Sequence, residues 1–131
     1  MIGELMAEFK GKATGIRVLS DGRVETSTSG MGRILGKEAS IADTSVGTPM
    51  PNGVYMLEGN SMVVTAEGEV VMVKTSGIGW ATGKGMKQSY RGASYQMTSS
   101  PNLASINKMV GVWEWESEEN GEYSLKVWEW K

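Results

Sequence analysis

The stretch Met62-Val63-Val64-Thr65-Ala66-Glu67-Gly68-Glu69-Val70-Val71-Met72-Val73 decides the fold class. Two apolar runs rich in β-branched residues, which favour strands, flank a short polar turn that contains glycine. The same arrangement surrounds Asp21-Gly22 and Asn120-Gly121. Such X-Gly pairs are typical of β-hairpins, because glycine adopts the positive φ angle that tight turns need. The chain is therefore predicted to consist of consecutive antiparallel hairpins.

The remainder of the chain extends this pattern and offers almost no helix, because glycine or β-branched residues interrupt every window of helical length. One helical turn is plausible over residues 101–107. Eight strands are predicted, over residues 5–19, 23–34, 37–46, 53–65, 69–82, 86–99, 109–118 and 121–130. This set predicts one all-β domain over residues 1–131, an eight-stranded antiparallel β-barrel whose interior is filled by side chains or holds one small ligand.

The composition excludes several classes of site and partner. The chain has no His and no Cys, so catalytic histidines, thiolate nucleophiles and the usual zinc, haem and iron–sulfur sites are excluded. It has 13 basic and 15 acidic residues and no basic stripe, so nucleic acid and anionic membranes are not expected partners. We expect no metal and no cofactor. A cytoplasmic location is expected, because neither a signal peptide nor an apolar run of membrane-spanning length is present.

One sequence pattern, T-S-G-x-G-x-x-x-G-K, occurs twice, at residues 28–37 and 75–84. A phosphate-binding loop would have a different glycine spacing, a Ser or Thr after the Lys and a helix behind it. We therefore interpret the paired glycines as positions on one strand face that permit the tight coiling of a small closed barrel.

The C-terminal half, residues 66–131, contains a distinctive set of segments: Ser89 to Tyr95, Thr98-Ser99-Ser100, Leu103, Ile106-Asn107 and the stretch from Val110 to Trp130. On these segments the chain resembles a known family, the small uncharacterised proteins of the allene oxide cyclase barrel-like group. The resemblance implies a calycin-like, eight-stranded antiparallel barrel that is usually oligomeric and has no assigned activity. The plant cyclases that name the fold isomerise a fatty-acid epoxide inside the barrel. Their catalytic motif matches no positions here, so no residue role is carried over.

Tryptophans flank the Asn120-Gly121 turn. If that turn has two residues, Trp113 lies opposite Trp128, and Trp115 and Trp130 share their face. A buried Trp removes on the order of 200 Å² from water, whereas burying unpaired carboxylates costs several kcal/mol each. The Trp face is therefore expected to lie in the lumen or at a subunit interface, as core packing or as a wall that stacks on a ligand.

The hairpin around Glu67-Gly68 suggests a candidate site. If these two residues form the turn, Glu58 and Asn60 share a strand face with the glycines Gly77 and Gly79. This face is expected to point inward, because its small residues leave room for the Trp side chains. Desolvation would raise the pKa of a carboxyl group there, and a neighbouring amide can hold a substrate oxygen. Glu58 and Asn60 are thus the candidate catalytic pair, unless they lie on a solvated part of the strand.

Further residues are expected around the same lumen. A Lys84-Gly85 turn places Tyr90, Ser94 and Gln96 inward. The candidate ligand-lining residues are Tyr90, Gln96, Trp113 and Trp128. The opposite strand face is also apolar, which predicts a homo-oligomer that buries it between subunits; this face carries Leu57, Val63, Ile78 and Trp80.

Two functions fit these observations. The first is a barrel that binds a small apolar or amphipathic molecule, as a cofactor-free isomerase or cyclase with Glu58 as its acid or base. The second is a non-catalytic oligomeric module whose lumen is filled by Trp and by some of the ten Met side chains, which fit irregular gaps. A cavity on the order of a few hundred Å³ that touches Glu58 favours the first function, and a filled interior favours the second.

Overall fold

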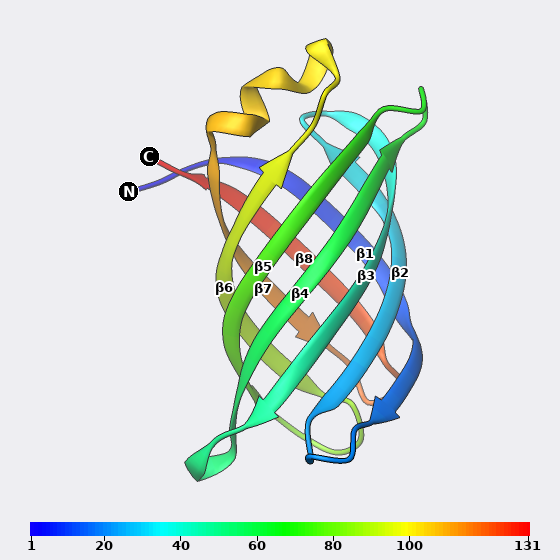
Figure 1. Cartoon of the computed structure of the whole chain (residues 1–131), viewed down its shortest axis with the longest axis vertical. Coiled ribbons are helices and arrows are strands. Elements are labelled where there is room, and N and C mark those ends of the chain that lie inside the picture. The colour runs from blue at the N-terminus through cyan, green and yellow to red at the C-terminus, as the bar shows by residue number, and fades with distance from the viewer.

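The strands pair in chain order, and the last strand closes the sheet on the first (Figure 1). The structure is a computed structural model that describes residues 1–131. Its strands are β1 (Ile2–Val18), β2 (Val24–Ile34), β3 (Lys37–Pro49), β4 (Val54–Thr65), β5 (Val70–Ala81), β6 (Gln88–Met97), β7 (Val110–Ser117) and β8 (Glu122–Trp130), with 3₁₀ segments η1 (Pro51–Gly53) and η2 (Pro101–Lys108). The predicted eight-stranded antiparallel barrel is confirmed, and η2 covers the predicted helical turn. Neither 3₁₀ segment is long and apolar enough to cross a membrane.

The three X-Gly turns are three-residue loops rather than two-residue loops. In the β7–β8 loop the Glu118 amide donates to the Glu122 carbonyl (2.8 Å), and the Gly121 amide donates to the Glu118 carbonyl (3.0 Å). Asn120 does not have a positive φ, whereas Gly121 has a φ of +88°. This is a type I turn followed by a left-handed glycine. The loops between Leu19 and Arg23 and between Thr65 and Glu69 have the same bonds and end in Gly22 and Gly68.

The extra loop residue moves the β4–β5 pairing by one position, which reverses the face of one strand relative to the other. Glu58 pairs with Ser76 and Asn60 pairs with Lys74, not with Gly77 and Thr75. Gly77 and Gly79 face inward as predicted, but Glu58 and Asn60 are exposed on the outer surface. The prediction that the Glu58–Asn60 pair projects into the lumen is wrong.

The β7–β8 hairpin shows the same one-residue shift. Trp113 pairs with Val127, and Trp128 pairs with Val112. Trp113 and Trp115 therefore face the lumen, while Trp128 lies on the outer face and does not line the cavity. The prediction that Trp113 and Trp128 stand opposite each other on one face is wrong.

The β5–β6 loop, in contrast, gives the register that the sequence predicted. The Thr82 amide donates to the Lys87 carbonyl across a four-residue loop, which leaves the same strand faces inward as a two-residue turn. Tyr90 consequently pairs with Gly79. Tyr90, Ser94 and Gln96 line the lumen, as predicted.

Inward-facing glycines bring strands and rings into close contact. A Cβ on Gly79 would lie 2.1 Å from the ring of Tyr90, and one on Gly77 would lie 2.9 Å from the ring of Trp113. In the other copy of the repeat, a Cβ on Gly32 would lie 1.8 Å from the Glu8 carbonyl oxygen. These contacts confirm the structural interpretation of the repeated pattern.

One end of the barrel is covered by η2 (Figure 1), whose Leu103 and Ile106 are buried. Ser100, just before η2, donates a hydrogen bond of 2.5 Å to Glu69, which also forms a 2.8 Å ion pair with Lys37. The Lys37 hydrogen bond, assisted by that of Ser100, lowers the pKa of Glu69 to about 2. These contacts attach η2, the cover of this barrel end, to the β4–β5 loop.

The outer surface carries many exposed apolar side chains. Met62 on β4, Met72 on β5 and Met97 on β6 form a row across three strands, and each is exposed. Ile78 and Trp80 are also exposed outside, as predicted. Leu57 and Val63 were expected on this face but line the lumen, because the β4–β5 register is shifted.

Candidate ligand-binding site

A cavity of about 300 Å³ remains inside the barrel. It extends from Ile106 of η2 to Ile16 and Met86, which lie near the loops at the opposite end. The lumen is therefore not filled by side chains, although the cavity does not touch Glu58. The apolar lining includes Phe9, Ile41, Leu57, Val63, Val73, Trp113, Trp115 and Val127.

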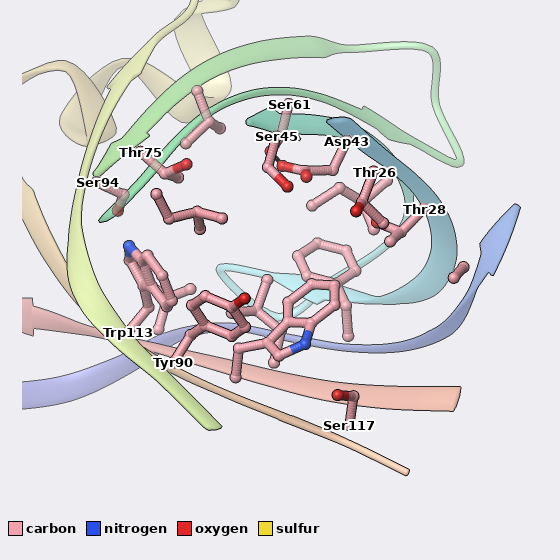
Figure 2. Close-up of a pocket in the computed structure, with 18 of the residues that line it drawn as sticks. Thr26, Thr28, Asp43, Ser45, Ser61, Thr75, Tyr90, Ser94, Trp113 and Ser117 are labelled. Atoms are coloured by element: carbon pink, nitrogen blue, oxygen red, sulfur yellow. Dashed lines mark hydrogen bonds between the residues drawn. The ribbon is translucent and has the colours of Figure 1, made fainter. Parts of the chain in front are cut away.

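Polar side chains gather on the side of the cavity that is formed by β2, β3 and β4. Thr28 pairs with Asp43, and Asp43 pairs with Ser61, so the three lie at one level of the sheet. Thr26 and Ser45 pair at the next inward level, nearer the β1–β2 loop. Figure 2 shows these five side chains together, across the cavity from Tyr90 and Trp113. We call this surface, made by Thr26, Thr28, Asp43, Ser45 and Ser61, the polar wall.

The position of Asp43 follows from the β2–β3 turn and from strand alternation. Leu35 and Gly36 both have positive φ values, +46° and +78°, in a two-residue turn that pairs Ile34 with Lys37. Alternation from this turn places Asp43 on the same inward face as Ile41. Asp43 was not among the predicted site residues. The sequence feature that could have identified it is a carboxyl group that alternates with the same period as the apolar residues of its strand and so shares their face.

The Asp43 carboxyl group has one hydrogen-bond donor and no cation. The Ser61 hydroxyl donates to it. None of the protein's ion pairs includes Asp43, and no Lys or Arg lines the cavity. Burial raises the pKa of Asp43, and the Ser61 hydrogen bond opposes that rise only in part. A carboxylate can accept several hydrogen bonds, so most of its acceptor capacity is unused by the protein.

Two buried hydroxyl groups, one in the polar wall and one next to it, also lack hydrogen-bond partners. The Oγ1 of Thr28 and the phenol of Tyr123 are buried and make no hydrogen bond. They lie near each other without reaching hydrogen-bond geometry, and burial raises the pKa of Tyr123 to about 12. Buried polar groups without partners are uncommon in folded proteins. Thr28 lines the cavity, so its Oγ1 marks this part of the lumen as a place where a ligand can form a hydrogen bond.

The facing surface is aromatic, and we call Tyr90, Trp113 and Trp115 the aromatic wall. Trp115 stacks on Tyr123, with ring centroids 3.8 Å apart. The indole N–H of Trp113 donates to the Ala93 carbonyl over 2.9 Å. Tyr90 differs, because its hydroxyl makes no hydrogen bond within the protein; burial, and to a lesser extent the neighbouring Tyr55, raise its pKa. Its side chain points into the cavity (Figure 2).

Of the predicted ligand-lining residues, Tyr90, Gln96 and Trp113 line the cavity. Gln96 is fully engaged within the protein, since its amide donates to the Met109 carbonyl (3.1 Å) and its oxygen accepts from Ser94. Tyr90 is the predicted residue whose polar atom remains available to a ligand. No group of three or more acidic side chains comes together to form a metal site.

No protein-family model and no curated protein matches the chain. Several solved structures are similar to it, and three of them cover nearly the whole length. A conserved protein of unknown function from Rhodopseudomonas palustris has 14% identity and a TM-score of 0.82, with 98% of this chain and 97% of that chain covered. A protein of unknown function from Clostridium acetobutylicum has 13% identity and a TM-score of 0.80, with 98% of each chain covered.

The third similar structure is described as a β-barrel like protein, from Acinetobacter baumannii. It has 14% identity and a TM-score of 0.81, with 100% of this chain and 96% of that chain covered. Identities this low show a shared fold alone. The comparisons thus support one part of the resemblance seen in the sequence, a β-barrel fold that occurs in proteins of unknown function.

Proposed function

We propose that this protein binds a small, largely apolar molecule inside the barrel, with the polar groups of the ligand against the polar wall. The observation that carries the proposal is the cavity of about 300 Å³ in which Asp43 has no cation and Thr28 has no hydrogen-bond partner. Apolar cavities with a few convergent polar groups are the usual form of a small-molecule site.

The size of the cavity limits the ligand. A cavity of roughly 150 Å³ accepts benzene, so a cavity of about 300 Å³ suits a molecule of two fused or linked rings. Because η2 covers one end, we place the entry at the end near Ile16 and Met86.

The geometry supports binding better than the isomerase or cyclase reaction expected from the sequence. That reaction depended on Glu58 and Asn60, which lie outside the barrel, so we do not retain them as a catalytic pair. A filled lumen, which the alternative function required, is not found. Binding requires only the cavity and the unpartnered polar groups that the lumen contains.

The proposal can be tested with N-phenyl-1-naphthylamine, a neutral dye that fluoresces in apolar surroundings. The rise in dye fluorescence reports binding, and the position of the bound dye is tested with variants. Two variants of β5 form a matched pair. Thr75→Phe adds a ring on the cavity side, whereas Ser76→Phe adds the same ring at the adjacent exposed position.

We expect saturable one-to-one binding to the wild type, unchanged binding to Ser76→Phe and strong loss of binding to Thr75→Phe. Circular dichroism establishes that both variants keep the strand signal. Ser45→Leu and its outward neighbour Thr44→Leu provide a second pair on β3 if Thr75→Phe does not fold. Absence of saturable binding, or equal binding to the inward and outward variants, would contradict the proposal.

A further inference from the structure

The cavity contains a single charged side chain, the Asp43 carboxyl group. Its other lining residues are apolar, hydroxyl, amide or glycine residues, without one Lys or Arg. The ion pairs that basic residues form with acidic ones, such as that of Arg91 with Glu116, lie outside the lumen. Any charge that a ligand brings into the barrel therefore interacts with a negative group or with none.

The aromatic wall faces this carboxyl group across the cavity (Figure 2). The faces of Trp and Tyr rings carry negative electrostatic potential and attract cations. Both sides of the lumen consequently favour a positively charged group and disfavour an anion. A fatty acid carboxylate, for example, would be desolvated here without a basic partner and beside Asp43.

We propose that the lumen selects a small amine with an apolar body, whose N–H groups donate to Asp43. This inference rests on the proposed function. An ammonium group has three donors and no acceptor. The carboxylate of Asp43 takes one or two of these donors, and the unpartnered Oγ1 of Thr28, its neighbour on β2, can take another. The hydrocarbon part packs against Tyr90 and Trp113.

Pairing with an amine also removes the energetic penalty of the isolated carboxylate. A buried charge is costly unless it is paired and hydrogen-bonded. Asp43 receives one hydrogen bond, from Ser61, and no ion pair within the protein. The ligand would supply the missing cation, in a water-poor space where charge-assisted hydrogen bonds are strong.

Three naphthalene probes of nearly equal size separate the chemical classes: 1-naphthylmethylamine, 1-naphthylmethanol and 1-naphthoate. Isothermal titration calorimetry at about pH 7.5, where the amine is charged, measures the affinity of each probe for the intact protein. The variants are Asp43→Asn, which keeps the shape of the side chain, and Glu58→Gln, which makes the same change at an exposed carboxyl group.

We expect the wild type to bind the amine about tenfold or more tightly than the alcohol, as loss of a hydrogen bond to a charged group implies, and to bind the carboxylate weakest. Asp43→Asn should abolish the preference for the amine, so that the variant binds the amine and the alcohol with similar affinity. Glu58→Gln should behave like the wild type. Equal affinities for amine and alcohol, or an amine preference that survives in Asp43→Asn, would overturn this inference.

The pH dependence gives a second readout that needs no variant. The groups around Asp43 are Thr28 on β2, Ser61 on β4 and the phenol of Tyr123 on β8, and the other titratable groups that line the cavity are Tyr55 and Tyr90. Burial raises the pKa of the Tyr90 and Tyr123 phenols above their usual alkaline value. Asp43 is thus the lumen group that takes up a proton as the pH is lowered. The ratio of amine to alcohol affinity should fall as the pH is lowered, and a constant ratio would overturn the inference.

The outcomes distinguish this inference from the function on which it rests. If the naphthyl alcohol and the neutral dye bind in the lumen but the amine has no advantage, binding stands and amine selection fails. If neither the dye nor any naphthalene probe binds, the proposed function fails and amine selection fails with it.

Discussion

The polar wall and the aromatic wall line the same cavity, yet they use their polar atoms differently. On the aromatic wall, the N–H of Trp113 is bonded to Ala93, and only the Tyr90 hydroxyl stays available; the neighbouring Gln96 is bonded to Met109 and Ser94. On the polar wall, Asp43 receives one hydrogen bond and Thr28 makes none. Polar atoms inside a barrel can therefore support the fold or remain free for a ligand, and their partners tell these roles apart.

Replacing Trp113 should have the largest effect on stability. Trp113 is 5% exposed and lies against Gly77 and Gly92, so Trp113→Ala should lower the free energy of unfolding by about 3–5 kcal/mol. Urea denaturation measures the change. Trp128→Ala, on the outer face, should cost much less, and equal losses for the two variants would contradict the inward assignment of Trp113.

Asp43 of the polar wall and Gln96 near the aromatic wall should respond with opposite signs when they are replaced. Asp43→Asn keeps an oxygen that can accept from Ser61 and removes a poorly compensated charge, so it should stabilise the protein at neutral pH by about 1 kcal/mol. Gln96→Leu leaves the Met109 carbonyl unsatisfied and should destabilise it by about 1–3 kcal/mol. Urea denaturation tests both changes, and a destabilised Asp43→Asn would show that the charge supports the fold.

The pH dependence of stability should separate Asp43 from Glu69, which holds the η2 cover. Burial raises the pKa of Asp43 in the folded state, so its contribution is lost as the pH rises through that raised value. The pKa of Glu69 is lowered to about 2, so its contribution is lost as the pH falls from about 4.5 toward 2. Asp43→Asn should therefore gain stability over the wild type as the pH rises, and Glu69→Gln should approach the wild type in acid.

These trends can be checked with urea midpoints of both variants and the wild type across the acidic range. A stability difference between Asp43→Asn and the wild type that does not vary with pH would contradict the buried position of the carboxyl group. Likewise, an unchanging difference for Glu69→Gln would mean that the contacts with Lys37 and Ser100 do not form in solution.

The smallest change in stability is expected outside the barrel. Met72 is 46% exposed, so Met72→Gln should leave the free energy of unfolding within about 0.5 kcal/mol. We predict that copies of the chain associate through the apolar outer face, which keeps Ile78 and Trp80 from the face expected from the sequence and also carries the row of Met62, Met72 and Met97. Sedimentation velocity should show an oligomer that Met72→Gln weakens, and a monomer at all concentrations would contradict the prediction.

The fold could be predicted from the sequence because it depends on features that are local. The alternation of apolar and polar residues and the glycine turns predict the position of every strand. A closed barrel follows from eight such strands in succession. The inward residues of β6, including Tyr90, were also predicted correctly, because the four-residue loop has the same parity as the assumed two-residue turn.

The site could not be predicted because it depends on loop length, which the X-Gly pairs do not specify. An Asn-Gly or Glu-Gly pair fits both a two-residue turn and the last two positions of a three-residue loop. One residue of difference moved Glu58 and Trp128 from the inside to the outside. Asp43 escaped notice for another reason, since a carboxyl group is ordinarily expected on the solvated face of a strand, although Asp43 is in phase with Ile41 on β3.

Methionine methyl groups offer the most direct test of the central claim, that the ligand binds in the lumen beside the polar wall. Met6 and Met86 line the cavity, whereas Met56, Met62 and Met72 lie exposed on the outer surface. In methyl-labelled protein, titration with 1-naphthylmethanol should shift the NMR signals of Met6 and Met86 and leave the outer signals in place. Shifts confined to Met56, Met62 and Met72 would contradict the claim, because the probe would then bind the outer face.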